Sequence, residues 1–339
     1  MNFIVIGAGA IGSYVGGRLA ASGYAVSFVA RPYQAEAFLQ DGLTVTDPDG
    51  FHGIVKGAAL KLYSDIATAW TESSSTIKDT VLLLCVKGGA TLPVAEDIAK
   101  VCPEGVTIIS LQNGVENVAR IKEGFPDSVA VAGMVPYNVI MKTKAHVHRT
   151  IPGFIFIGTG SLSETISACF NHVGLKTKVS PNMLSVQWGK LLLNLNNPIN
   201  ALANLPLRDE FLNHDYRIIW ATLQLEALKA MRSADIEPMQ LTAVSPRVFP
   251  YLLKSPNWVF TRLAARLLKS IDPHARSSMW DDIQQGRKTE VDDLCGAVVR
   301  LSKKHGTAAP CNAAMRSLMV AHTKDQAYTG KSLRKALNL

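Results

Sequence analysis

A glycine-rich turn near the start of the chain constrains its fold more than any other feature. The run Gly7-Ala8-Gly9-Ala10-Ile11-Gly12 has the spacing G-x-G-x-x-G, directly follows the apolar run Phe3–Ile6 and opens a stretch of helical period. Between a strand and a helix, the first glycine allows a tight turn, the second lets the backbone approach a pyrophosphate, and the third lets the helix pack closely. The pattern predicts a dinucleotide-binding unit. The alternative is a structural turn that binds no nucleotide.

The first part of the chain alternates β-rich runs with helical stretches, which predicts a parallel sheet with right-handed crossovers. Continuous apolar runs bounded by turn residues predict buried strands at Phe3–Ile6, Ala25–Ala30, Thr80–Val86 and Val106–Leu111. The expected intervening helices are Ile11–Ala21, Thr91–Val101 and Val115–Ile121.

Further β-rich runs follow the same half of the chain. Leu43–Thr46 and Phe51–Val55 flank a turn and are expected to form an inserted hairpin. Val129–Met141, Ala145–Arg149 and Phe154–Ile157 are expected to be antiparallel strands that complete the sheet.

Beyond Pro181 the periodicity changes to that of long helices. The predicted helices are Met183–Leu202, Phe211–Ala234, Met239–Leu253 and Thr289–Lys304. We therefore expect an α/β Rossmann domain over residues 1–180 and an all-helical domain over residues 181–339.

The residue after the second predicted strand indicates which dinucleotide is bound. NAD-binding proteins usually carry Asp or Glu there, about 20 residues beyond the glycines, to bond the ribose 2′-hydroxyl. This chain has Arg31 instead. Because a guanidinium bonds a 2′-phosphate and a carboxylate repels it, the sequence predicts NADPH. The alternative is a surface arginine before Pro32.

Two more polar residues follow strands at the same predicted edge of the sheet. Lys87 comes directly after Thr80–Val86, where a lysine is well placed to bind phosphate. Asn113 follows Val106–Leu111 and could bond the ribose or the nicotinamide amide. Because Asn-Gly is also a common turn pair, turn and ligand roles both remain open for Asn113.

Composition excludes several other classes of protein. The net charge of +8 is dispersed, without an arginine-rich stretch or a stacking aromatic array, so no nucleic acid is expected. A general positive field would attract a phosphorylated cofactor and an anionic substrate, although the charge could also serve solubility alone. No apolar run approaches the roughly 18 residues of a membrane span.

Cysteines and the start of the chain point to a reducing compartment. The five cysteines are scattered, without a C-x-x-C pair, which argues against disulfides and zinc. His146 and His148 lie on a β-rich segment without further ligands, so no metal is expected. Met1 leads directly into an apolar strand without a basic region, so we expect no secretory signal and a cytoplasmic protein.

The start of the second half carries a polar stripe among leucines. Lys190, Asn194 and Asn197 are spaced i, i+4 and i+7, which places them on one face of a continuous helix. Burying a lysine and amides is costly without partners, so the stripe is expected to line a polar site. Repeated asparagine, a poor helix former, indicates either side-chain chemistry or a broken helix. A solvated polar face is the alternative.

A second polar cluster occurs at Ser277-Ser278-Met279-Trp280-Asp281-Asp282 and Thr289-Glu290-Val291-Asp292. Ser277 could cap a helix, with the two aspartates in its first turn. Thr289 could cap the next helix. Spacing alone does not single out Glu290 as functional.

The whole chain resembles the ketopantoate reductase (2-dehydropantoate 2-reductase) family. The matching residues are the glycine turn at 7–12, Arg31, Val86-Lys87, Gln112-Asn113-Gly114, Lys190 with Asn194, Ser277-Ser278-Met279, Thr289-Glu290-Val291-Asp292, and His305-Gly306 with Pro310. They extend in order from the first residues to about residue 325.

The resemblance implies a fold, a reaction and residue roles. The family has a Rossmann domain followed by a helical domain like that of 6-phosphogluconate dehydrogenase. Its members use NADPH to reduce the ketone of a small 2-oxo acid, which implies a small anionic substrate. Lys190 would be the catalytic lysine and Glu290 the active-site carboxylate. Asn194 and Ser278 would bind substrate. Arg31 and Lys87 would bind the adenosine 2′-phosphate. The sequence does not fix the oligomeric state, and a homodimer is the assembly considered.

Three departures from the family pattern stand out. Members often carry a second asparagine eight residues after the lysine, where this chain has Pro198, so Asn197 or Asn200 would replace it. Cys295 stands where asparagine is usual before Gly296. The segment 240–275 is longer than in shorter members. The substrate is therefore expected to be ketopantoate or a related 2-oxo acid.

Two rival functions come from other classes. A β-hydroxyacid dehydrogenase also combines a Rossmann domain with a helical domain that bears a lysine and an asparagine, but Ser277–Met279 and Thr289–Asp292 argue against it. A non-catalytic NADPH sensor would need neither Lys190 nor Glu290.

Overall fold

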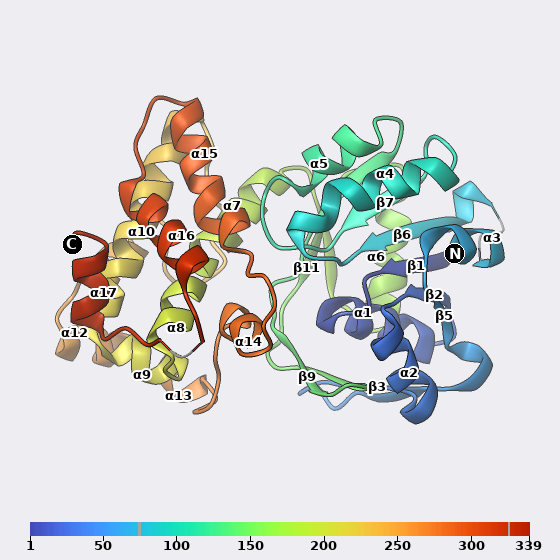
Figure 1. Cartoon of the computed structure of the whole chain (residues 1–339), viewed down its shortest axis with the longest axis horizontal. Coiled ribbons are helices and arrows are strands. Elements are labelled where there is room, and N and C mark those ends of the chain that lie inside the picture. The colour runs from blue at the N-terminus through green and yellow to red at the C-terminus, as the bar shows by residue number, and fades with distance from the viewer. Residues whose placement is uncertain (74–75, 325) are drawn as a thin grey trace. The chain divides into compact units, whose positions relative to one another are not determined.

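The computed structural model describes residues 1–73, 76–324 and 326–339. The chain divides into two compact units, Met1–Met183 and Leu184–Leu339, near the division expected at residue 180. Figure 1 shows an α/β unit that contains the N-terminus and a helical unit that contains the C-terminus. The predicted fold class, a Rossmann domain followed by an all-helical domain, is confirmed.

The first unit is built on an eight-stranded sheet with strand order β12-β11-β8-β7-β6-β1-β2-β5. The strands are β1 (Asn2–Ile6), β2 (Ala25–Val29), β5 (Lys61–Tyr63), β6 (Thr80–Leu84), β7 (Thr107–Ser110), β8 (Val129–Met134), β11 (Ile155–Gly158) and β12 (Thr177–Ser180). From β5 through β8 every neighbouring pair is parallel. From β1 the chain adds β2 and β5 on one side of the sheet, and then β6, β7 and β8 on the other side of β1. The strand order thus reverses between β1 and β6, and dinucleotides bind at such a switch point.

Both faces of this sheet are buried, because side chains alternate along each strand. Phe3 and Val5 of β1 join one buried cluster, and Ile4 and Ile6 join another. The first cluster is covered by α1 (Ala10–Ala21), α2 (Pro32–Asp41) and α6 (Ser163–His172), and the second by α3 (Ile66–Ser73), α4 (Thr91–Val101) and α5 (Asn117–Gly124). The sequence patterns do not predict α2, α3, α6, β5 or β12.

A second, four-stranded sheet has the order β4-β3-β10-β9. It contains β3 (Leu43–Thr46), β4 (His52–Val55), β9 (Val139–Thr143) and β10 (His146–Arg149). The predicted hairpin is confirmed, because β3 and β4 pair antiparallel. The buried pair Arg18–Asp47, 2.5 Å apart, links α1 to this sheet. Removing one partner of such a pair costs about 3–5 kcal/mol.

Three predicted antiparallel strands do not complete the main sheet as expected. Val129–Met141 divides into β8 and β9, which belong to different sheets. Pro136 lies between them, and proline has no N–H to donate to a ladder. β8 runs parallel to β7, β10 pairs in the second sheet, and β11 alone pairs antiparallel with β8.

The described residues of the second unit form helices and turns without strands. The helices are α7 (Met183–Asn194), α8 (Asn197–Ala203), α9 (Leu207–Leu212), α10 (His214–Ser233), α11 (Phe249–Leu253), α12 (Asn257–Leu263), α13 (Ala265–Ser270), α14 (Ser278–Gln284), α15 (Ala297–Lys304), α16 (Pro310–Ala321) and α17 (Gly330–Ala336). A π-helical turn, Asp292–Gly296, precedes α15. No described helix is long and apolar enough to cross a membrane.

The predicted helix Met183–Leu202 is broken between α7 and α8. The carbonyl of Leu192 accepts hydrogen bonds from Trp220 Nε1 at 3.3 Å and Gln224 Nε2 at 3.0 Å, both on α10. The N–H of Asn196 instead donates to Leu193 at 3.2 Å, a tighter turn than the α-helix makes. α7 therefore ends where α10 supplies donors to its last carbonyls.

The predicted helix Met239–Leu253 is wrong for most of its length, since only Phe249–Leu253 is helical. The preceding segment lies along α7, where Met239 donates its N–H to the Ser185 carbonyl at 2.9 Å. A Cβ at Gly189 would overlap the Met239 carbonyl, so glycine is what permits this approach. Contacts with α7 override the helical period of the segment.

Candidate active site

The glycine turn between β1 and α1 has the geometry of a dinucleotide cradle. Gly7 has φ +101°, which favours glycine. A Cβ at Gly12 would overlap the Gly7 carbonyl, so α1 approaches the turn as closely as glycine allows. A Cβ at Gly9 would meet no atom within 4 Å. Gly9 thus has free space in front of its backbone, where a phosphate would approach.

The polar residues predicted to bind the dinucleotide follow strands at the carboxyl edge of the same sheet. Arg31 comes two residues after β2 and is exposed, and Lys87 follows β6 and is also exposed. Asn113 follows β7 and is half-buried. Gly114 has φ +95°, and the chain bends at Asn113-Gly114. The backbone carbonyl of Asn113 accepts from Asn117 Nδ2 at 2.7 Å.

In the second unit, α7 brings Lys190 and Asn194 together one turn apart. Lys190 is half-buried and Asn194 is 9% exposed. Burial lowers the pKa of Lys190 to about 8. A lysine with such a pKa keeps its proton at neutral pH but releases it more readily than an exposed lysine does. These two residues therefore combine a proton donor with an amide.

Asn197 does not continue the stripe on the same helix. It begins α8 after the break at 195–196, so the predicted i+7 position on one face is wrong. Its side chain is half-buried. Asn200 is fully buried, and its side chain is already bonded to Glu210, Leu205 and Ser277. Asn197 is therefore a better candidate than Asn200 for the second asparagine of the family pattern, at whose position this chain has Pro198.

Ser277 caps α14 as predicted, because its Oγ accepts from the Trp280 N–H at 3.2 Å. The same hydroxyl donates to the Asn197 carbonyl at 3.1 Å. Ser278 is the first residue of α14 and is half-buried. The structure thus brings the start of α14 next to the start of α8, two segments 80 residues apart in sequence.

Glu290 lies in the segment that enters the π-helical turn and is half-buried. Its carbonyl accepts from the N–H groups of Asp293 at 3.0 Å and Leu294 at 3.2 Å. Glu290, rather than the expected Thr289, therefore precedes the helix. Arg287 donates from Nε to Asp282 Oδ1 at 2.9 Å, which links this segment to α14.

Cys295, the other departure from the family pattern, lies within the π-helical turn. It is fully buried, and burial raises the pKa of its thiol. Among the described residues there is no cluster of three metal-binding side chains.

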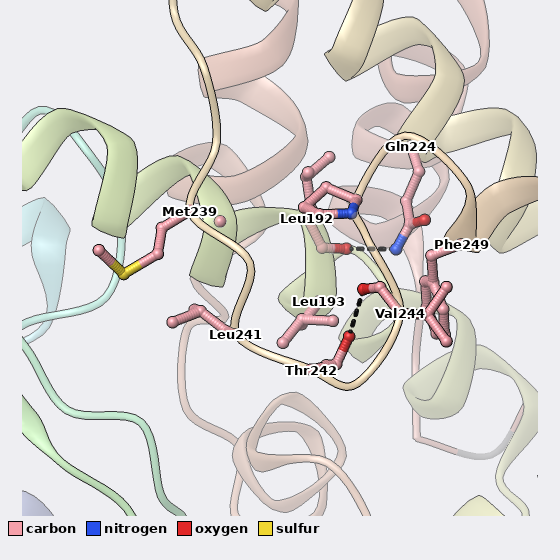
Figure 2. A pocket seen from close by; sticks show the side chains of 10 residues that line it. Leu192, Leu193, Gln224, Met239, Leu241, Thr242, Val244 and Phe249 are labelled. Carbon is pink, nitrogen blue, oxygen red and sulfur yellow. Dashed lines mark hydrogen bonds between the residues drawn. The ribbon is translucent and has the colours of Figure 1, made fainter.

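An apolar pocket lies on another face of α7 (Figure 2). It is lined by Leu192, Leu193, Met239, Leu241, Val244 and Phe249, with Gln224 donating to the Leu192 carbonyl. At about 100° per residue, the side of α7 that lines it points roughly 130° away from Lys190 and Asn194. This pocket is therefore separate from the polar site.

Glu210 and its contacts were not found from sequence. Glu210 is 1% exposed, and burial raises its pKa to about 8, although hydrogen bonds from Asn200 and Asn196 oppose this shift. The sequence signal was weak, because Arg208-Asp209-Glu210 resembles any charged surface turn.

The open glycine turn in a Rossmann sheet, the half-buried lysine of lowered pKa in a helical unit and the family match together define a nicotinamide-dependent oxidoreductase. The chain belongs to the ketopantoate reductase family. Residues 3–161 match the family described as "Ketopantoate reductase PanE/ApbA", and residues 182–322 match its C-terminal counterpart. The resemblance predicted from the motifs is confirmed.

Known proteins are similar over nearly the whole chain. The 2-dehydropantoate 2-reductase of Pyrococcus horikoshii is 26% identical, covering 95% of this chain and 97% of that protein. The crystal structure of a ketopantoate reductase from Ralstonia eutropha has a TM-score of 0.78 at 24% identity, covering 94% of this chain and 97% of that one.

The same fold also occurs in a dehydrogenase that is named for a different acid. A D-mandelate dehydrogenase, solved with NADH and anilino(oxo)acetate, has a TM-score of 0.73 at 17% identity and covers all of both chains. The fold is thus found in proteins described with different 2-oxo or 2-hydroxy acids.

Proposed function

We propose that this protein is an NADPH-dependent 2-oxo acid reductase that converts 2-dehydropantoate (ketopantoate) to pantoate. The observation that carries the proposal is Lys190, a half-buried lysine of lowered pKa with Asn194 one turn away on α7. Membership of the ketopantoate reductase family supports the same reaction.

Lys190 acts on the substrate ketone. When bound, the reduced nicotinamide supplies a hydride to the ketone carbon. As negative charge develops on the ketone oxygen, the Lys190 ammonium stabilises it and then transfers its proton there as a general acid. The lowered pKa suits this step, because it makes the ammonium a stronger acid near neutral pH.

The remaining side chains orient the substrate. Asn194, Asn197 and Ser278 can donate hydrogen bonds to its carboxylate and hydroxyl oxygens. Glu290 accepts from the substrate hydroxyl or orients Lys190. In this proposal the residues that bind substrate all come from α7, α8, α14 and the segment before α15.

The cofactor is proposed to bind at the glycine turn. Gly7, Ala8, Gly9, Ala10, Ile11 and Gly12 would hold the pyrophosphate, supported by the open space at Gly9. Arg31 and Lys87 would bind the adenosine 2′-phosphate, which makes NADPH the preferred form. Asn113 would bond the ribose or the nicotinamide amide.

The reaction is tested by following NADPH oxidation at 340 nm with ketopantoate and with 2-oxoisovalerate, a branched 2-oxo acid that has no hydroxyl group. A site that bonds the hydroxyl rejects the analogue by a factor of up to about 10⁴ in kcat/KM. We expect high kcat/KM for ketopantoate and poor activity on the analogue. Equal activity on both would remove the hydroxyl-binding role of Glu290.

Glu290→Ala sharpens this test. The variant should lose most of the wild-type preference for ketopantoate over 2-oxoisovalerate. Its kcat/KM should fall more for ketopantoate than for 2-oxoisovalerate. Glu237→Ala, at an exposed glutamate on the same unit, is the matched control and should leave the ratio unchanged.

A related 2-oxo acid is the second candidate substrate, favoured by Pro198, Cys295 and the similarity to D-mandelate dehydrogenase. Phenylglyoxylate, the 2-oxo acid that corresponds to mandelate, therefore belongs in the assay. Selective reduction of it would identify a paralogue with an aromatic substrate.

We also propose that the protein assembles as a homodimer. A ketopantoate reductase from Staphylococcus aureus with the same fold, at a TM-score of 0.70 and 19% identity, is described as dimeric. Light scattering on the purified protein tests this, and a monomeric mass would contradict it.

A further inference from the structure

We propose that Glu210 and Asn200 are positioning residues, which hold the segments carrying Asn197 and Ser278 in the arrangement that binds the substrate. The proposal rests on the function proposed above, because Asn197 and Ser278 are the substrate ligands in that function. Neither Glu210 nor Asn200 needs to touch the substrate.

The contacts form a closed ring between α8 and Ser277 at the start of α14, and Glu210 of α9 is bonded to this ring through Asn200. Asn200 Nδ2 donates to Glu210 Oε2 at 2.6 Å and to the Leu205 carbonyl at 2.9 Å. Asn200 Oδ1 accepts from the Ser277 N–H at 2.8 Å. Ser277 Oγ then donates back to the Asn197 carbonyl at 3.1 Å. The ring thus passes directly beside both proposed ligands.

These bonds fix the orientation of the Asn200 amide. An amide nitrogen can only donate and its oxygen can only accept. A flipped Asn200 would turn its nitrogen toward the Ser277 N–H and its oxygen toward the Leu205 carbonyl, so both of these bonds would be lost. Because Asn200 is fully buried, water cannot replace them. Ser277 and Leu205 therefore set the orientation in which Asn200 donates to Glu210.

Glu210 also holds the turn on the other side of Asn197. Its carboxyl group receives a second hydrogen bond from the side chain of Asn196. The two asparagines that bond Glu210 thus flank Asn197 in sequence. A backbone bond from Leu207 to the Ala275 carbonyl, at 2.9 Å, holds α9 against the segment that leads into Ser277.

Burying this carboxyl group is costly unless its hydrogen bonds are satisfied. Burial also raises the pKa of Glu210 to about 8, which favours the neutral carboxylic acid at pH 7. The neutral form still accepts from the asparagines through its oxygens. Glutamine, which has nearly the same shape, is neutral and keeps one acceptor oxygen, should therefore preserve the bond from Asn200, whereas leucine should not.

The experiment compares Glu210→Leu, Glu210→Gln and the control Asp209→Asn, an exposed acid on the same helix. The measurements are kcat and KM for ketopantoate, the Kd of NADPH, thermal unfolding, and amide hydrogen exchange of the intact enzyme. We expect Glu210→Leu to raise KM about 5- to 50-fold, the scale of a buried donor left unpaired. NADPH Kd should stay within about twofold. Amide hydrogen exchange at residues 277–280 should become faster.

The conservative variant separates positioning from general stability. Glu210→Gln should restore KM to within about threefold of wild type and restore slow exchange, while Asp209→Asn behaves as wild type. If Glu210→Leu does not fold, Asn200→Ser removes the ring member that Glu210 holds and should also raise KM.

Unchanged KM and unchanged exchange in Glu210→Leu would overturn the proposal. So would equal losses in KM, kcat and NADPH affinity that follow the fall in thermal stability, since that result indicates a structural role only. If wild type reduces no 2-oxo acid, the proposed function fails. The exchange result still decides whether the ring holds 277–280.

Discussion

The two units present their candidate ligands in opposite ways. In the first unit, the cradle is made by backbone, with exposed Arg31 and Lys87 at the edge of a sheet. In the second unit, the polar groups are buried or half-buried, and helices distant in sequence hold them. A dinucleotide carries many charges that exposed cations can reach, whereas a small 2-oxo acid must be surrounded.

This difference teaches which side chains control which step. Exposed cations at an open edge contribute affinity that depends on salt and on the cofactor's phosphates. Buried groups act with less screening, so they can stabilise charge that develops during reaction. We therefore expect changes in the second unit to lower turnover and changes in the first to weaken cofactor binding.

The largest effect is expected from Lys190→Ala. Loss of the positioned general acid should lower kcat by about 10²–10⁴, while NADPH affinity and folding persist. Stopped-flow turnover, NADPH fluorescence titration and circular dichroism measure these separately. Lys229→Ala, at an exposed lysine of the same unit, is the matched control. Near-normal kcat in Lys190→Ala would exclude Lys190 from the mechanism.

A second test is the pH dependence of kcat/KM, which reports the titration of the enzyme before substrate binds. Only the protonated Lys190 donates, and its pKa is about 8, so kcat/KM should be constant well below pH 8 and fall about tenfold per pH unit above it. Half of Lys190 is protonated at pH 8, so the expected loss from pH 8 to pH 10 is about 50-fold. A flat kcat/KM profile through this range would contradict the assignment of Lys190 as the acid.

A loss of folding stability caused by the titration of Lys190 does not explain the fall in activity above pH 8. Its folded pKa is lowered, so between about pH 8 and 10.5 the unfolded chain binds the proton that the folded chain has released, and stability from this group rises with pH. The pKa of Glu210 is raised to about 8, so its contribution falls as pH rises through 8. Measuring the kcat/KM profile in Glu210→Gln as well removes that second titration.

The third prediction concerns the first unit. Arg31→Ala should weaken NADPH binding by about 1.5–3 kcal/mol, or roughly 10- to 150-fold, and leave NADH nearly unchanged. Lys61→Ala is the control. Lys61 begins β5, which runs parallel to β2, so it lies at the opposite end of the strands from Arg31. Equal losses for both cofactors would show that Arg31 is structural.

The sequence predicted the first unit better than the second for a physical reason. The glycine turn, β1, α1 and α4 depend on neighbouring residues, so local patterns specify them. The ring of Asn200, Glu210 and Ser277 depends on contacts between segments far apart, and no local pattern encodes it. The break after Asn194 likewise depends on donors from α10. Glu290 was identified only through family resemblance.

The smallest effect is expected at Gly9, and it isolates the cradle itself. Gly9 has φ −77°, which alanine also adopts, and a Cβ there would meet no protein atom within 4 Å. Gly9→Ala should therefore leave thermal stability unchanged. The methyl group would occupy the space that a pyrophosphate needs, so NADPH and NADH should both bind more weakly, by about tenfold or less, on the scale of ~1 kcal/mol.

Gly12→Ala is the matched contrast on the same turn. A Cβ at Gly12 would overlap the Gly7 carbonyl, so this variant should lose stability by about 1–3 kcal/mol before any ligand is added. Thermal unfolding without cofactor, followed by titration of each dinucleotide, separates the two glycines. If Gly9→Ala bound both cofactors as tightly as wild type, the open space at Gly9 would not be where the phosphates bind. The first unit would then need another cofactor surface, and the contrast between an open cradle and a surrounded substrate site would no longer hold.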